Sequence, residues 1–291
     1  MAHVLTLIAR REATVLDAAT IARVAGAVRG LTPDILSPGE AVDIPLLEAP
    51  EMAAVRDALA GREIDAAVVS SRGRRKGLLI ADMDSTIITC ETLDEIAVFA
   101  GIGERIAAIT ARAMNNEIGF EEALRERVGM LKGLDIGALE KAWARVALTP
   151  GARELVATMR AKGALTALVS GGFTFFTGRV AAMLGFHLHR ANTLLHDGQA
   201  LTGAVAEPIL GRDAKLAALT ELAAERRLRL AATLAVGDGA NDLAMLAAAG
   251  LGVAFHAKPA VAAAARVRID HADLRALLFL QGYRAAEFSA G

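Results

Sequence analysis

The stretch GLLIADMDSTIITCE, residues 77–91, runs from an uncharged apolar segment directly into two aspartates that are one residue apart. Short, nearly continuous apolar runs of this kind are typical of parallel strands that are covered on both faces. Carboxylates are costly to bury unless they are paired or bind a metal ion. The position of Asp82 and Asp84 at the end of a buried strand therefore has to be explained by what the rest of the chain brings near them.

Three later segments have the same apolar character: ALTALVSGG (164–172), AATLAVGDG (231–239) and GLGVAF (250–255). Helical patterns separate them, so the sequence predicts an α/β fold with a Rossmann-like parallel sheet. In open α/β sheets, ligands bind beyond the carboxyl ends of the strands. We therefore expect the polar residues at these strand ends to meet at one crevice: Asp82, Asp84, Ser170, Asp238 and Asp242.

A long helical insertion, at about residues 92–150, separates the first two predicted strands, and it is large enough to form a cap over the crevice. In its segment GFEEALRERVGMLKG (119–133), helical periodicity places Phe120, Leu124, Arg127 and Leu131 on one face. Arg127 is thus a charge within an apolar stripe. It either extends to solvent at the edge of the stripe or points at an anionic ligand under the cap.

Residues 1–70 show a β-α-β-β-α-β pattern, which is typical of a small regulatory or packing module of α+β type. The basic segment RGRRK (72–76) follows it and is interpreted as a solvated connector. The expected organisation is therefore an N-terminal module at residues 1–70 and a second domain at residues 71–291 that carries the cap.

Composition excludes several classes of protein. The chain has 291 residues, 54% of them hydrophobic and 22% charged, and a formal net charge of -1, so a sizeable core is expected and a nucleic-acid partner is not. No apolar run reaches the roughly 20 residues that a membrane span needs, and the N-terminus lacks a signal-peptide pattern. Cys90 is the single cysteine, which fits a reducing compartment, so a soluble cytoplasmic protein is expected.

The polar residues at the strand ends suit phosphoryl transfer. Two carboxylates one residue apart can divide the work, one as nucleophile and the other as general acid and base. Asp238 and Asp242 offer the oxygen ligands that magnesium prefers, and Lys215 offers a fixed cation. Ser170 and the backbone N–H groups that follow it can donate to a phosphate. A calcium loop is a poor alternative for DMDST, because its sixth and twelfth positions would be Ile87 and Leu93.

These segments resemble, in order, the four motifs of the haloacid-dehalogenase-type phosphatases, and more narrowly those of the phosphoserine phosphatases. The matching segments are DMDST (82–86), SGGF (170–173), the isolated Lys215 and GDGANDLAML (237–246), together with ETLDEIA (91–97), LRERV (124–128) and AKP (257–259). The resemblance covers about residues 77–280, and residues 1–70 look like the ACT-type modules that accompany some bacterial members.

The resemblance implies a role for each matching residue. Asp82 would be the nucleophile that becomes an aspartyl-phosphate, and Asp84 would protonate the leaving alcohol and then activate water. Ser170, Gly171 and Lys215 would hold the phosphate, with Asn241 nearby. Asp82, the backbone carbonyl of Asp84 and Asp238 would bind Mg²⁺, and Asp242 would support that site. Glu91 and Arg127 would hold the amino and carboxylate groups of the substrate, which resolves the choice for Arg127 in favour of a ligand.

The implied reaction is hydrolysis of O-phosphoserine to serine and phosphate, the last step of serine biosynthesis. Two alternatives stay open at this stage. One is a phosphotransferase on the same scaffold that passes the phosphoryl group to another alcohol such as homoserine. The other is a non-catalytic amino-acid sensor, against which the intact set of Asp82, Asp84, Lys215 and Asp238 argues. Assembly as a homodimer is also left open.

Overall fold

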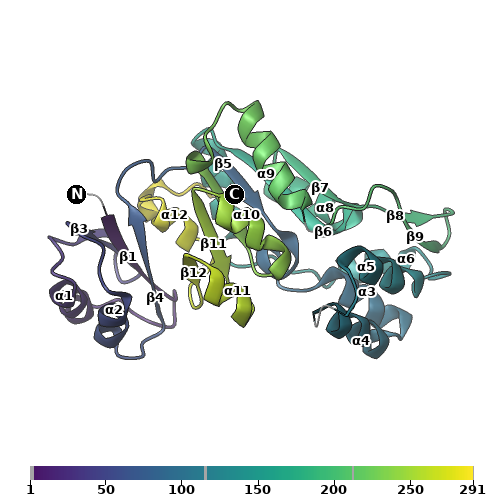
Figure 1. Ribbon diagram of the computed structural model, residues 1–291, viewed down its shortest axis with the longest axis horizontal. Helices are drawn as coiled ribbons and strands as arrows, with labels where there is room; N and C mark the ends of the chain where they lie inside the picture. Colours follow the sequence, from purple (N-terminus) through teal and green to yellow (C-terminus); the bar gives the residue numbers. More distant parts are fainter. Residues whose placement is uncertain (1–2, 115–116, 212, 291) are drawn as a thin grey trace.

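The computed structural model of the protein describes residues 3–114, 117–211 and 213–290. Figure 1 shows a small sheet of N-terminal strands at one end, a larger sheet in the middle and a group of helices at the other end. This is the α/β architecture that the sequence predicts. No helix among the described residues has the length and apolar character needed to cross a bilayer.

The N-terminal sheet is antiparallel, with strand order β2-β3-β1-β4. Its elements are β1 (His3–Ala9), α1 (Ala18–Ala27), β2 (Asp34–Ser37), β3 (Ala41–Leu46), α2 (Met52–Leu59) and β4 (Ile64–Ser70). The predicted β-α-β-β-α-β order is confirmed. Successive side chains of β1 point to opposite faces of the sheet. Leu5 and Leu7 pack in the cluster that the two helices cover, whereas Ile8 belongs to the core of the rest of the chain. The sheet is therefore buried on both faces.

The central sheet is parallel, with strand order β12-β11-β10-β5-β6-β7. Its strands are β5 (Leu78–Ala81), β6 (Leu165–Phe173), β7 (Leu188–Asn192), β10 (Thr233–Gly237), β11 (Leu251–Phe255) and β12 (Val267–Ile269). The four strands predicted from apolar runs are confirmed and occupy the middle of the sheet. The two edge strands, β7 and β12, were not predicted.

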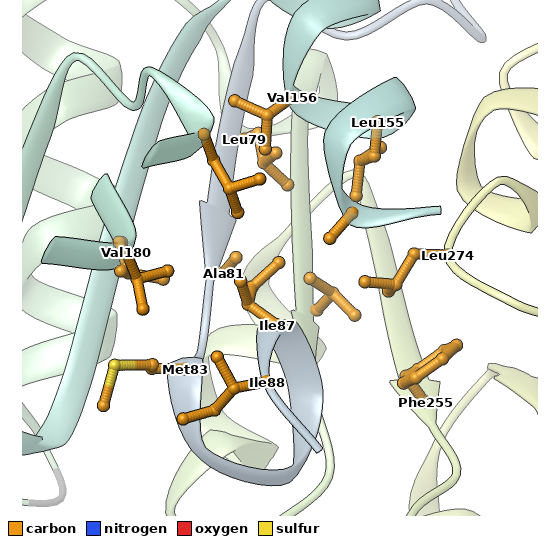
Figure 2. Packing of buried hydrophobic residues seen from close by; sticks show 14 of the residues in the cluster. Leu79, Ala81, Met83, Ile87, Ile88, Leu155, Val156, Val180, Phe255 and Leu274 are labelled. Carbon is orange, nitrogen blue, oxygen red and sulfur yellow. The ribbon is translucent and has the colours of Figure 1, made fainter. Parts of the chain in front are cut away.

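Helices cover both faces of this sheet, as the Rossmann-like prediction requires. The covering helices are α7 (Ala152–Ala161), α8 (Thr174–Leu184), α9 (Ala214–Glu225), α10 (Leu243–Ala248), α11 (Pro259–Ala264) and α12 (Ala276–Leu280). Figure 2 shows Leu79 and Ala81 of β5 packed with Val156 of α7 and Val180 of α8. Burying such an aliphatic side chain contributes roughly 1.5–3 kcal/mol, and all four residues of β5 are buried. The end of this strand is therefore firmly placed.

The insertion between β5 and β6 is helical, as predicted, and forms a cap at one end of the molecule (Figure 1). It contains α3 (Thr92–Ala100), α4 (Gly103–Met114), α5 (Phe120–Gly129) and α6 (Gly137–Trp143). A hairpin that was not predicted, β8 (Leu194–His196) and β9 (Leu201–Val205), joins the cap. Leu201 accepts a backbone hydrogen bond from Gly133 at 2.8 Å and donates one to Leu134 at 2.9 Å. The cap is thus built from two separate parts of the chain.

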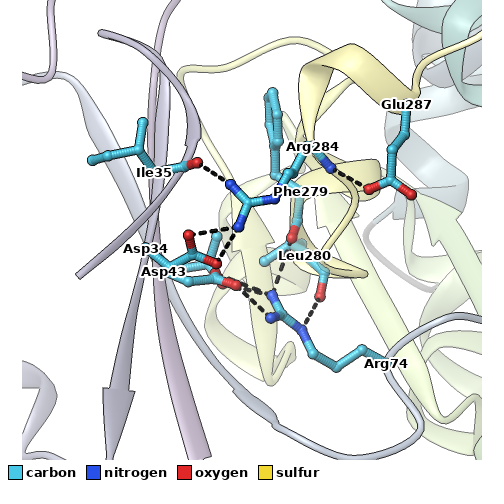
Figure 3. Close-up of polar contacts among 9 residues, drawn as sticks. Asp34, Ile35, Asp43, Arg74, Phe279, Leu280, Arg284 and Glu287 are labelled. Carbon is cyan, nitrogen blue, oxygen red and sulfur yellow. Dashed lines mark hydrogen bonds and ion pairs between the residues drawn. The ribbon is translucent and has the colours of Figure 1, made fainter. Parts of the chain in front are cut away.

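Arginines connect the N-terminal sheet to the end of the central part. Arg74 pairs with Asp43 of β3, with 3.1 Å between Nη2 and Oδ1, and donates to the backbone oxygens of Phe279 and Leu280 at 3.1 Å each (Figure 3). These oxygens belong to the last turn of α12, where carbonyls lack helical partners. The interpretation of residues 72–76 as a solvated connector is wrong for Arg74, whose side chain is 12% exposed.

Candidate active site

Asp82 is the first residue after β5, and the chain turns sharply behind it. Its Oδ1 accepts the backbone N–H of Met83 at 2.7 Å. The backbone N–H of Ile88 donates to the backbone oxygen of Met83 at 3.0 Å, and this hydrogen bond closes the turn. Within the turn, Ser85 has a φ of +53°, in the left-handed region that non-glycine residues rarely adopt. Such strain is maintained only where the surroundings fix the backbone. The turn therefore holds Asp82 and Asp84 in set positions.

Lys215 lies beneath the turn as a buried cation between two carboxylates. Its Nζ is 2.7 Å from Oδ2 of Asp82 and 2.6 Å from Oδ1 of Asp242. The second oxygen of Asp242 accepts the N–H of Gly239 at 3.0 Å. Burial opposes the charge of Lys215, but the two carboxylates outweigh it, so the pKa of Lys215 lies above its ordinary value. Lys215 is thus a permanent positive charge against Asp82.

Asp82, Asp238 and Asp242 form a cluster that suits a divalent metal ion. One carboxylate oxygen from each lies within 4.8 Å of the others, and all three residues are buried. Burial, together with the charge of Asp242, raises the pKa of Asp238 to about 6. Burial and the same neighbour also raise the pKa of Asp82, although Lys215 opposes the shift. Lys215, together with Lys258 near Asp238, does not balance three buried carboxylates. Oxygen donors are the ligands that Mg²⁺ prefers, so the donor set fits such an ion.

Asp84 is not part of that cluster. Its side chain contacts residues of α3 and β6. Its Oδ1 accepts the N–H of Thr92 at 2.9 Å, and its Oδ2 accepts the hydroxyl of Ser170 at 3.3 Å. Burial and the nearby charge of Glu91 raise the pKa of Asp84 to about 7. A carboxyl group with a pKa near neutrality can both give and take a proton at physiological pH. Asp84 therefore has the properties of a general acid and base.

The ends of β5, β6 and β10, together with the cap, line one cavity of about 1330 Å³. Eight of the ten residues predicted from the sequence line it: Asp82, Asp84, Glu91, Arg127, Ser170, Gly171, Asp238 and Asn241. Of the other two, Lys215 contacts Asp82, and Asp242 contacts Lys215. The structure thus brings all of the predicted residues together.

The cap region brings charged side chains to this cavity: Glu91 and Arg127, and also Glu117, Glu121 and Glu122. Glu91 is exposed to it and accepts the hydroxyl of Ser85 at 2.8 Å. Arg127 is held by the oxygen of Ala123 at 3.1 Å and by Oγ1 of Thr110 at 3.4 Å. Burial lowers the pKa of Arg127, and within the described chain neither it nor Glu91 forms an ion pair. Both charges therefore remain available for a ligand that carries an ammonium and a carboxylate.

Two residues that support the site were missed by sequence reasoning. Asn192, at the end of β7, donates to the oxygen of Gly171 at 2.9 Å and accepts the N–H of Leu210 at 2.8 Å. Thr86 donates to Oδ1 of Asp238 at 3.2 Å. Thr86 lies inside the DMDST motif, so the motif could have indicated that Thr86 belongs to the site. Asn192 lies in no recognisable motif, and only the sheet order reveals that it orients the strand-end loop.

The chain is similar to the proteins of a known family. Residues 79–247 match the family described as "HAD: haloacid dehalogenase-like hydrolase". A phosphoserine phosphatase from Streptomyces coelicolor is 43% identical over 230 residues, which are 78% of this chain and 56% of that protein. The chain therefore spans little more than half the length of that relative.

Two solved structures extend the comparison to the fold. A probable phosphoserine phosphatase from Vibrio cholerae is 33% identical, with a TM-score of 0.80 and coverage of 98% of this chain and 88% of that one. A structure described as a phospho-aspartyl intermediate analogue of phosphoserine phosphatase is 41% identical, with a TM-score of 0.66 and coverage of 70% and 98%. On its motifs, its fold and the extent of these matches, the chain belongs to the haloacid dehalogenase-like hydrolase family.

Proposed function

We propose that this protein hydrolyses O-phosphoserine to serine and phosphate through an aspartyl-phosphate on Asp82. The observation that carries the proposal is the arrangement of Asp82 and Asp84 after the end of β5, in a cavity that is also lined by Arg127 of the cap. The names of the related phosphatases, one of them described as a phospho-aspartyl intermediate analogue, support the same reaction.

In the first step, a carboxylate oxygen of Asp82 forms a bond to phosphorus, and the bond between phosphorus and the serine oxygen breaks. Asp84 gives its proton to that leaving oxygen, so serine departs as a neutral alcohol. The pKa of about 7 keeps a large fraction of Asp84 protonated near neutral pH. The phosphoryl group is then carried by Asp82.

In the second step, water attacks phosphorus and the bond between phosphorus and the oxygen of Asp82 breaks. Asp84, now ionised, takes the proton of the attacking water, which restores both carboxyl groups to their starting states. The hydroxyl of Ser170, the N–H groups that follow it and Lys215 would neutralise the equatorial phosphate oxygens. Ser170 already lies 3.3 Å from Asp84, so the proton donor and the phosphate site are adjacent.

The same proposal assigns Mg²⁺ to Asp82, the backbone carbonyl of Asp84 and Asp238, with Asp242 supporting them. When bound there, the ion supplies positive charge that offsets repulsion between the Asp82 carboxylate and the phosphate. Two unit charges about 4 Å apart repel by roughly 4 kcal/mol at an effective dielectric constant near 20. Lys215, whose Nζ is 2.7 Å from Oδ2 of Asp82, also reduces that repulsion.

Substrate choice is proposed to depend on the cap. Arg127 would bind the carboxylate of phosphoserine, and Glu91 would bind its ammonium, because both side chains reach the cavity as unpaired charges among the described residues. Contacts of a guanidinium with a carboxylate can be bidentate, which gives geometric selectivity as well as affinity. A phosphate ester without these two groups would lack both contacts.

The test is release of inorganic phosphate from O-phosphoserine with and without Mg²⁺, by the wild type and by Asp82→Asn. We expect Mg²⁺-dependent release by the wild type and loss of turnover in the variant, whose amide cannot form the acyl-phosphate. Sustained turnover by Asp82→Asn would contradict the nucleophile assignment. Product analysis with homoserine present distinguishes water from an alcohol as the acceptor.

For the N-terminal 70 residues we propose a packing role as a separate module. The observation that supports it is the position of this sheet against the last helix of the central part, through Arg74 and Asp43 (Figure 3). None of the residues that line the large cavity comes from this part of the chain. The module would then affect stability without entering the chemical steps.

A further inference from the structure

A second cavity, of about 160 Å³, lies where the N-terminal sheet meets the central sheet. It lies beside two edge strands, β4 of the first sheet and β12 of the second. At one end these strands are joined by Asp65, whose oxygens accept the N–H groups of Asp270 and Ala272 at 2.8 Å each. Near the other end, Ser70 and Val267 line the cavity. A single water needs only roughly 10–15 Å³ of such space, so a small molecule fits.

The basic segment after β4 presents alternate residues to this cavity. Arg72, Arg74 and Lys76 line it, whereas the intervening Arg75 does not. Arg75 instead reaches Glu287 at 2.8 Å and lies over the ring of Tyr283. The segment RGRRK thus brings three cations to the wall of the cavity, where Arg266 of the central part adds a fourth.

These charges are mostly unbalanced. Arg74 is paired with Asp43, but no carboxylate in the described chain lies within ion-pair distance of Arg72, Lys76 or Arg266. Among the residues that the structure describes, no aspartate or glutamate lines the cavity.

The polar contacts of two of these cations are to backbone oxygens. Lys76 donates to the oxygens of Gly73 and Ala231, both at 2.8 Å, and burial lowers its pKa. Arg266 donates to the oxygen of Ala247 at 2.7 Å. Like charges gathered around a small cavity repel one another, and an anion inside it would relieve that repulsion.

We propose that this cavity binds a phosphate group, either as inorganic phosphate or as part of a small phosphate monoester. Guanidinium groups match phosphate oxygens with paired N–H donors, and a lysine adds a point charge. Arg72 and Lys76 approach from the segment after β4, and Arg266 approaches from the start of β12. A bound anion would therefore hold the N-terminal sheet to the central sheet. The site shares no lining residue with the large cavity, so it goes beyond the proposed function.

The test is a titration of the metal-free 291-residue chain with sodium phosphate at constant ionic strength, followed by amide NMR. Glycine signals report on the two cavities separately, because Gly250 and Gly252 line the second cavity and Gly171 and Gly172 line the large one. We expect saturable shifts of Gly250 and Gly252, which sodium chloride at equal ionic strength does not produce. Shifts confined to Gly171 and Gly172, or produced equally by chloride, would overturn the proposal.

Matched variants test the cations themselves. In Arg72→Gln/Arg266→Gln, the phosphate dissociation constant read from Gly250 should rise at least tenfold. In the control Arg75→Gln/Arg268→Gln it should stay within twofold, because Arg268 pairs with Asp270 and neither control residue lines the cavity. Equal affinity in the two double variants would contradict the proposal.

A single substitution covers the case in which the double variant folds poorly. Arg72 is exposed, so Arg72→Gln alone should fold and weaken binding at least threefold, and unchanged binding would count against the site. Repeating the titration with glycerol phosphate distinguishes the two sources of the ligand. Tighter binding than inorganic phosphate assigns the cavity to a monoester, and weaker binding assigns it to the free ion.

Discussion

At the scale of single residues, the properties of the site depend on which carboxylates have a positively charged partner and which do not. Lys215 is shared by Asp82 and Asp242, at 2.7 and 2.6 Å, so it cannot neutralise the whole acidic cluster. Asp84 is held apart, with hydrogen bonds to Thr92 and Ser170 and a pKa of about 7. Two aspartates one residue apart thus have different environments, which suits one for attack and the other for proton transfer.

Substitution of Arg127 should separate recognition from chemistry. Hydrogen bonds to charged groups are worth roughly 1.5–3 kcal/mol, so Arg127→Ala should lower kcat/KM for O-phosphoserine about tenfold to a hundredfold. Glu91→Gln should act in the same direction through the ammonium group. Turnover of an aryl phosphate, which has neither group, should change much less.

The matched control is Arg125→Ala, on the same helix, because Arg125 is exposed, does not line the cavity and pairs with Glu207 more closely than with Glu121 of the cavity wall. It should leave both substrates nearly unaffected. Equal losses on the two substrates in Arg127→Ala would mean that Arg127 supports the fold or the chemistry instead of the substrate's carboxylate.

At the scale of elements, the sequence predicted best what is buried and regular. The central strands have apolar residues on both faces, so each appears in the sequence as a continuous apolar run. The predicted ends of these runs gave the correct positions in the fold for Asp82, Ser170 and Asp238. The edge strand β12 spans three residues, which is too short to give a pattern. The hairpin of β8 and β9 is partly exposed, so its apolar pattern is weak. Its turn contains Asp197-Gly198, a pair that favours tight hairpin turns and could have indicated it.

The docking of that hairpin on the cap depends on Gly203. Its φ is +80°, and an added Cβ would lie 2.8 Å from Cβ of Lys132 and 3.2 Å from the oxygen of Gly129. Gly203→Ala should therefore lower the free energy of unfolding by about 2–3 kcal/mol, through backbone strain and overpacking together. Urea unfolding measures the change.

Gly198 provides the comparison, because its φ is also positive, +102°, but nothing lies within 4 Å of an added Cβ. Gly198→Ala should show the backbone strain alone, about 1 kcal/mol. If the two variants were equally destabilised, contact between the hairpin and the cap would not be the reason that glycine is needed at position 203.

At the scale of the whole molecule, the N-terminal sheet and the central part share one core and a set of arginine contacts. Ile8, Leu36 and Ala67 belong to the same buried cluster as α12, and Arg284 pairs with Asp34 at 2.7 Å (Figure 3). Sequence reasoning predicted both parts but not their contact, because the residues that join them are more than 200 positions apart in the chain.

Adjacent arginines allow a direct test of that contact. Arg74→Ala leaves Asp43 buried without its partner, and breaking a buried pair typically costs about 3–5 kcal/mol. Arg75→Ala removes a pair whose arginine is 52% exposed, and exposed pairs are worth about 0–1 kcal/mol. Thermal unfolding should therefore separate the two variants clearly. Similar midpoints would show that the two sheets are held together mainly by apolar packing.

The central claim is that Asp82 carries the phosphoryl group during turnover, and it can be measured directly. Wild-type protein is mixed with phosphate-labelled O-phosphoserine and Mg²⁺, quenched in acid within one turnover and digested for peptide mass spectrometry. We predict label on the peptide that contains Asp82, and none in Asp82→Asn, although that variant should still bind the substrate. Rapid release of phosphate by the wild type with no labelled peptide at any quench time, or label on a residue other than Asp82, would contradict the account.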